Sequence, residues 1–416
     1  MASLFVRFRV GNFPKVSRRL LLVVRLIRPS LSRCFALGLC ASVSLALGAA
    51  AVGPGTALAK TANASQPSVL APDETPSSPQ FREALTRAHA GDANAQNQVA
   101  TMLASGQGTA KAPAEAVRWW AQAATAGLVD AQFNLGLAYD QGVGVAQNAT
   151  QAAEWYEKAA NAGNVPALYN LAGLYSTGHG VAMNHDKATK LFETAAEKGH
   201  IKAAYNAGLA YSRGQGVERD DGKAFRLMHK AANGGHSRAQ YALAQMYGQG
   251  IGVAKDATQS AHWLERAAKS GHARAQYSYA LHCQQGQGTP QNPSAAVRWY
   301  KEAAAKNHTG AMCNLALLLL EGKAAPKDPA EAEKLLLRAA EMGDTKAQYN
   351  LGMVLLNGQD IPQNVEQAYF WLALAERHGI PEATVARQQA AKELGRAQKE
   401  ALDAKILGFK PRTAPH

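Results

Sequence analysis

The chain has 416 residues and a formal net charge of +13, of which +8 comes from one lysine and seven arginines in the first 59 residues, where no acidic residue occurs. The remaining +5 gives little support to a nucleic-acid partner, and the chain has no motif that interleaves aromatic and basic residues as RNA-binding domains do. A single globular core of this length would be large, whereas a repeat protein grows by adding layers.

The first 59 residues are predicted to be an export signal. A basic stretch is followed by an apolar run over 35–52 and by Ala57-Leu58-Ala59 in front of Lys60. This is the layout of a secretory signal with a small-residue cleavage site. The basic stretch is longer than usual, so a later translation start and an uncleaved N-terminal anchor stay open as alternatives.

Residues 60–80 are predicted to be a linker, because prolines and serines interrupt any regular pattern there. Residues 81–90 resemble half of the unit that follows, and we expect them to cap its first copy.

A unit of 36 residues then repeats eight times over residues 91–378. Each copy carries two apolar stripes of helical period, such as Ala131, Leu135 and Tyr139 followed by Trp155 and Ala159. The sequence therefore predicts one helical hairpin per copy. The register is set by one turn position, which is occupied by Gly91, Gly127, Gly163, Gly199, Gly235, Gly271, Asn307, Gly343 and Gly379.

The segment inside each hairpin has its own repeated signals. One glycine follows the first helix in every copy, as expected for a residue at positive φ. Asn or Asp stands before the second helix in every copy except the first, which has Ala112 followed by Pro113, and these residues are predicted N-caps. The glycines are Gly106, Gly142, Gly178, Gly214, Gly250, Gly286, Gly322 and Gly358, and the caps are Asn148, Asn184, Asp220, Asp256, Asn292, Asp328 and Asn364.

Two columns of invariant alanines predict close helix crossings, where a larger side chain would overpack the contact at a cost of roughly 1–3 kcal/mol. The columns are Ala95, Ala131, Ala167, Ala203, Ala239, Ala275, Ala311 and Ala347, and Ala123, Ala159, Ala195, Ala231, Ala267, Ala303, Ala339 and Ala375. Core packing is also predicted for Trp119, Trp155, Trp263, Trp299 and Trp371. Cys283 and Cys313 replace core residues in adjacent copies, which favours buried free thiols over a disulfide between them.

The pattern A-x-x-x-L-G-x-x-Y-x-x-G-x-G-V, then Asp or Asn, then K-A-x-x-W-Y-x-K-A-A strongly resembles the Sel-1-like repeat family, whose members are relatives of the tetratricopeptide repeat. The resemblance implies an all-α, right-handed α/α solenoid with a concave wall of helices. Residues 379–416 are then expected to form a capping helix, over 382–407, and a short tail.

No catalytic or metal site is predicted. The motifs S-x-x-K, G-x-S-x-G and H-E-x-x-H are all absent, so we expect a protein that is not an enzyme and uses no cofactor. One histidine per copy forms a ladder: His200, His236, His272 and His308. Neighbouring helices pack about 8–10 Å apart, which is too far for ladder neighbours to share a metal easily, so solvated turn histidines are predicted.

A binding column is predicted on the first helices. By alignment its asparagines match the position at which peptide-binding tetratricopeptide repeats grip a ligand's backbone or carboxylate: Asn134, Asn170, Asn206, Asn314 and Asn350. Basic residues lie one helical turn earlier, at Lys202, Arg238, Arg274 and Lys346. Together they suit an extended, acidic peptide on the concave wall. In the alternative, the asparagines only bond to the neighbouring copy and the basic residues are ordinary solvated charges.

The leading interpretation is a non-catalytic scaffold or adaptor in the periplasm or cell envelope, or outside the cell. It would bind a protein or peptide, with no nucleic-acid partner, and the resemblance implies roles in regulating a signalling receptor or assembling envelope and polysaccharide machinery. One alternative is a β-lactamase-like hydrolase of the family's cysteine-rich branch, against which the missing cysteine pairs argue. Another is an adaptor of quality control in the endoplasmic reticulum lumen, with possible glycosylation sites at Asn63, Asn148 and Asn307.

Overall fold

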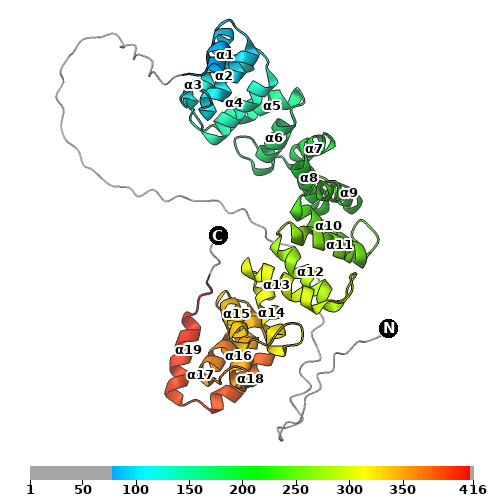
Figure 1. Cartoon of the computed structure of the whole chain (residues 1–416), viewed down its shortest axis with the longest axis vertical. Helices are drawn as coiled ribbons and strands as arrows, with labels where there is room; N and C mark the ends of the chain where they lie inside the picture. The colour runs from blue at the N-terminus through cyan, green and yellow to red at the C-terminus, as the bar shows by residue number, and fades with distance from the viewer. Residues whose placement is uncertain (1–76, 413–416) are drawn as a thin grey trace, which may run out of the picture. The chain divides into compact units, whose positions relative to one another are not determined.

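The computed structural model describes residues 77–412, so the predicted export signal and residues 60–76 of the predicted linker lie outside the described part. The described residues form 19 α-helices and no strand, which confirms the all-α prediction. Figure 1 shows these helices following one another in chain order from α1 to α19. No helix among residues 77–412 combines the length and the hydropathy needed to cross a bilayer.

Eight hairpins account for most of the helices. Their first helices are α2 (Ala93–Ser105), α4 (Val129–Gln141), α6 (Val165–Thr177), α8 (Ile201–Arg213), α10 (Ser237–Gln249), α12 (Ala273–Gln285), α14 (Thr309–Glu321) and α16 (Thr345–Asn357). Their second helices are α3 (Pro113–Thr125), α5 (Ala149–Asn161), α7 (His185–Glu197), α9 (Asp221–Asn233), α11 (Ala257–Lys269), α13 (Pro293–Ala305), α15 (Pro329–Glu341) and α17 (Val365–Arg377). One helix precedes them, α1 (Pro79–His89), and two follow, α18 (Glu382–Lys392) and α19 (Arg396–Gly408).

The turn chemistry that defines each hairpin is confirmed. All eight glycines after the first helices have φ between 64° and 81°, a region that other residues adopt only with strain. Asn307, which replaces a turn glycine, is the one described residue other than glycine with a positive φ, at 62°. Asn148 accepts hydrogen bonds from the backbone N–H groups of Thr150 and Gln151, both at 3.1 Å, and the other six predicted caps make equivalent bonds.

The two alanine columns are helix crossings, as predicted, because every member is at most 1% exposed. The second glycine of the G-x-G motif marks another close approach. A Cβ atom on Gly144 would stand 2.2 Å from the carbonyl oxygen of Pro113, at the start of the preceding second helix. Gly180, Gly216, Gly252 and Gly288 make the same close approach, so the loops of repeats 2 to 6 rest on the backbone of the repeat before them.

The predicted aromatic core is correct in part. Trp119, Trp263 and Trp371 are buried, but Trp155 and Trp299 are half-exposed at the surface of the second helices. The ammonium group of Lys158 lies 3.8 Å from the ring centroid of Trp155. Both described cysteines are buried and free, which confirms the predicted thiols.

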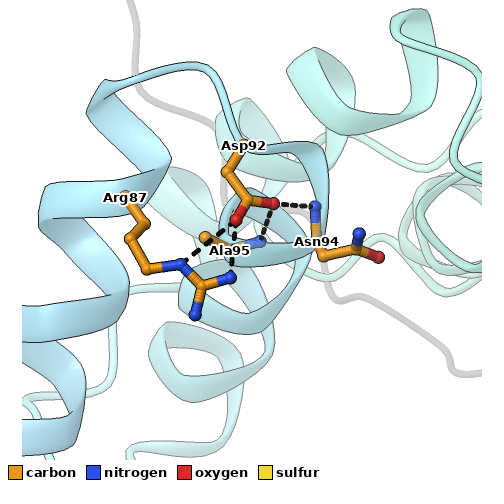
Figure 2. Close-up of polar contacts among 4 residues, drawn as sticks. All are labelled: Arg87, Asp92, Asn94 and Ala95. Carbon is orange, nitrogen blue, oxygen red and sulfur yellow. Dashed lines mark hydrogen bonds and ion pairs between the residues drawn. The ribbon is translucent and has the colours of Figure 1, made fainter.

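The N-terminal end is closed by α1, which begins at Pro79, two residues before the predicted linker ends, because the Ser78 hydroxyl accepts a hydrogen bond from the Phe81 N–H. Figure 2 shows how α1 joins the first hairpin. One oxygen of Asp92 caps α2 through the N–H groups of Asn94 and Ala95, and the other accepts two bonds from Arg87 at 3.1 and 2.6 Å.

At the C-terminal end, the prediction of a single capping helix is wrong. Residues 393–395 break the segment into α18 and α19, because Leu394 turns into the core and the Gly395 N–H donates to the side chain of Gln398 at 2.8 Å. Phe409, after α19, packs its ring 5.8 Å from that of Trp371. The end of the last hairpin is thereby covered.

Candidate protein-binding face

The predicted binding residues lie on the first helices, beside the stripe of buried alanines and leucines; we name this surface the first-helix face. The asparagine column is half-buried there, and the basic residues are exposed. No carboxylate among residues 77–412 lies within ion-pair distance of Lys202, Arg238 or Arg274. These positive charges are therefore exposed to solvent without an internal partner.

The histidine ladder differs from the prediction of solvated turn residues. Each of these side chains is the N-cap of a first helix, and its Nδ1 accepts the backbone N–H three residues ahead. The distances are 3.1 Å for His200 and 3.2 Å for His236, His272 and His308. Nδ1 must be unprotonated to accept, so this geometry requires the neutral imidazole.

Each ladder histidine is also stacked on a tyrosine of the preceding repeat. The ring centroids are 4.4–4.9 Å apart and the planes differ by 21–30°. The four pairs are Tyr169 with His200, Tyr205 with His236, Tyr241 with His272, and Tyr277 with His308. The histidines are half-buried for this reason, and each stack ties one first helix to the next.

Burial lowers the pKa of all four ladder histidines, and nearby cations lower it further. The pKa of His236 is lowered by Arg238, on the helix that His236 caps, and by Lys202, on the preceding first helix. His272 responds in the same way to Arg274 and Arg238. Arg238 thus lies near two ladder histidines, and the basic residues of successive repeats follow one another along this face.

Most of the asparagine side chains contact polar groups on neighbouring helices of the solenoid. Asn134 donates to the side chain of Asn97 at 3.0 Å, and Asn350 donates to the sulfur of Cys313 at 3.1 Å, in both cases on the preceding first helix. Asn314 donates to the Tyr300 hydroxyl at 3.1 Å, and Asn170 lies close to the Tyr156 hydroxyl. These contacts match the alternative in which the asparagines join neighbouring helices.

The comparison with protein families decides what kind of chain this is. The Sel1 repeat model matches residues 93–128, 129–164, 165–200, 201–236, 237–272, 273–308, 309–344 and 345–380. The chain belongs to the Sel1 repeat family. The matched units begin two residues after the predicted ones, just past the turn glycine, and cover the same eight hairpins.

Solved structures of Sel1 repeat proteins are similar to this one. The chain is 29% identical to a Sel1 repeat protein from Oxalobacter formigenes, over 75% of this chain and 90% of that one, with a TM-score of 0.58. It is 25% identical to c5321, a protective antigen of uropathogenic Escherichia coli with an SLR fold, over 81% and 98% of the two chains, with a TM-score of 0.32. A comparison with curated proteins finds no match.

Sel1 repeat proteins are typically scaffolds for protein interactions, and the fold is generally non-catalytic. In this member the predicted basic residues are exposed, whereas most of the predicted asparagines contact neighbouring helices. Sequence reasoning missed the capping role of the histidines. A signal for it was present, because Asp92, Asn164 and Asp344 are side-chain caps at the same position in other repeats.

Proposed function

We propose that this Sel1 repeat protein is a non-catalytic scaffold that binds a protein along the first-helix face of its middle repeats. The observation that supports this most is the row of exposed cations without internal partners, Lys202, Arg238 and Arg274, set beside the stacked tyrosines and histidines. Aromatic surface with adjacent guanidinium groups is typical of protein interfaces.

The repeat spacing indicates the shape of the bound segment. First helices of neighbouring repeats pack about 8–10 Å apart, and an extended chain advances about 3.3 Å per residue. An extended segment with an acidic residue at about every third position would place one carboxylate near each cation. The proposed partner is therefore a protein that presents an extended, acidic segment.

We also propose that the scaffold works in the periplasm or cell envelope. The basis is the composition of residues 1–59, with a basic start, an apolar run and the Ala57-Leu58-Ala59 site. Expression with the first 59 residues removed should leave the protein in the cytoplasm, whereas the full chain should be exported. Equal distribution of both forms in a cell fractionation would contradict this location.

A partner captured by crosslinking in the native cell allows a direct test of the face. Replacing Lys202, Arg238 and Arg274 together by glutamine should weaken binding at least tenfold and flatten its salt dependence. The matched control replaces Arg118, Arg226 and Lys334, which are exposed, occupy the sixth position of α3, α9 and α15, and carry the same total charge. Equal affinity of the two triple variants, both still helical, would reject the first-helix face.

A further inference from the structure

On the other side of the solenoid, a lysine bridges the groove between successive second helices in repeats 3 and 4. The ammonium group of Lys187, on α7, donates to Glu157 of the preceding repeat at 3.0 Å and to the Tyr175 hydroxyl of its own repeat at 2.6 Å. One repeat later, Lys223 donates to the Tyr211 hydroxyl at 2.6 Å and pairs with Glu193. The tyrosine, the lysine and the glutamate form a closed unit in each case.

Where repeats 5 and 6 meet, the glutamate of repeat 5 is kept, but repeat 6 lacks the tyrosine and the lysine. Glu265 stands at the position of Glu157 and Glu193, while Cys283 replaces the tyrosine and Ala295 replaces the lysine. A hollow of about 930 Å³ lies between α11 and α13, over α12, where the two long side chains are missing, whereas the equivalent hollow in repeat 4, which is lined by Tyr211 and Lys223, has about 700 Å³. The hollow is lined by Glu265, Cys283 and Ala295, together with Tyr279 and Trp299.

One buried hydrogen-bond acceptor beside the hollow has no partner in the described part of the chain. Gln276 is 3% exposed and lines the hollow, and its Oε1 has no partner among the described residues. The equivalent oxygens are occupied in other repeats: that of Gln240 accepts from the Ser270 hydroxyl at 3.5 Å, and that of Gln348 faces His378 at 3.2 Å. A buried acceptor without a donor costs free energy, which a bound donor would recover.

Aromatic surface and charge complete the lining. The rings of Tyr279 and Trp299 lie edge to face with their centroids 5.8 Å apart. Glu265 is half-buried and close enough to raise the pKa of both Tyr279 and Cys283, in addition to the effect of burial. Cations are attracted by aromatic faces and by carboxylates alike.

The basic side chains at this site stand at its rim. Lys269, Arg298 and Lys301 line the hollow but are exposed, and Lys269 already pairs with Glu265 at 2.7 Å. Salt and water screen such exposed charges more strongly than a half-buried carboxylate. An incoming ammonium group must displace Lys269 from Glu265. Because the rim is basic, an anionic ligand could bind there instead, and a test must compare the two.

We infer that the hollow between α11 and α13 is a second binding site, which accepts a lysine side chain of a protein partner in the place that Lys187 and Lys223 fill in their own repeats. The inference shares with the proposed function only the assumption that the partner is a protein. The alkyl stem would lie over Ala295 and Cys283, and the ammonium group would reach Glu265. The volume exceeds that of one side chain, so the segment that carries the lysine also fits.

Cys283 allows the chemistry of this site to be measured without the partner. The full chain is equilibrated under mild reduction with an equal mixture of three small disulfides, which add aminoethyl, hydroxyethyl or carboxyethyl groups of similar length to a thiol. Peptide mapping by mass spectrometry then gives the share of each group on Cys283. We expect the aminoethyl group to exceed the hydroxyethyl group at least threefold, and Glu265→Gln to bring this ratio close to one.

Three outcomes would overturn the inference: equal labelling by the amine and the alcohol, preference for the carboxylate, or no label on Cys283 in the folded chain. A filled variant provides the second measurement. Ala295→Lys rebuilds the lysine of repeats 3 and 4 and should reduce aminoethyl labelling several-fold, whereas Ala295→Met, with a similar stem and no charge, should reduce all three labels equally.

The source of the amine is tested by competition. N-acetyl-lysine methylamide and butylamine, each at tens of millimolar, should both lower the aminoethyl share on Cys283. Competition by butylamine alone would point to a small amine and contradict the lysine of a protein. These results do not depend on the first-helix face, so the site and the proposed function can fail separately.

Discussion

Single glycines in this chain are needed for two different reasons, which substitution can separate. Gly127 has a φ of 91° and open space around its Cα, whereas Gly144 has a φ of 75° and faces the Pro113 backbone. Gly127→Ala should lower the free energy of unfolding by about 1–2 kcal/mol, because alanine is strained at a positive φ. Gly144→Ala should cost roughly 1–3 kcal/mol more through overpacking. Urea unfolding of both variants checks the difference, and equal losses would contradict the close loop contact.

The ladder histidines predict a pH dependence of stability at the same scale. Their pKa values in the folded state are lowered, so the unfolded chain binds protons more readily. Their contribution to stability is therefore complete above pH of about 6.5, the pKa of an unperturbed histidine, and is lost progressively as the pH falls below it. We expect the melting temperature to be lower at pH 5 than at pH 7.5.

Aspartate supplies the control for this prediction, because Asp344 caps α16 from the same position and the ordinary pKa of the aspartate side chain, about 3.9, lies below this range. Replacing all four ladder histidines by aspartate keeps an acceptor at each cap. The loss of melting temperature between pH 7.5 and pH 5 should be smaller in this variant than in the parent chain. An unchanged loss would assign the acid sensitivity to other groups.

The individual helix hairpins could be predicted almost completely from sequence, because each boundary is fixed by a local requirement. A turn glycine, a capping Asn or Asp and an alanine crossing act within a few residues of one another. The end of the chain lacks such signals. Leu394 and Gly395 separate α18 from α19 through a buried side chain and a glycine cap, and the charged pattern around them reads as one continuous helix.

The C-terminal helices predict a local effect on the last hairpin. Phe409 packs on Trp371 and Phe370, and Tyr369 donates to Asp403 of α19 at 2.9 Å. Phe409→Ala should expose part of this aromatic surface and destabilise the end by about 1–2 kcal/mol. Hydrogen exchange should quicken in α17 and α19 and remain unchanged in α3. Faster exchange throughout the chain would contradict a local cap.

For the molecule as a whole, stacking predicts that stability is coupled between neighbours and fades with distance. Ala203→Leu should overpack the crossing in repeat 4, because Ala203 is completely buried. We expect faster hydrogen exchange in α7, α8 and α9 and little change in α16. Loss of protection in all repeats together would show a single cooperative unit.

The candidate sites could be predicted only in part, for a reason that also lies at this scale. The exposed cations follow from helical spacing, since their period of 36 residues places them on one face. The occupied asparagines and the hollow at Ala295 depend on side chains from neighbouring helices in three dimensions. One sequence shows which residue replaces a lysine, but not that Glu265, Gln276 and Trp299 then surround an open space.

The central claim is that the first-helix face holds a protein partner, and position-specific photo-crosslinking in the native cell tests it most directly. A photoreactive residue is placed singly at Lys202, Arg238 or Arg274, and at Arg118, Arg226 or Lys334 for comparison. The account predicts one and the same crosslinked protein at the first three positions and at most a small fraction of it at the other three. Equal crosslinking on both sides, or none on the first-helix face, would contradict the account.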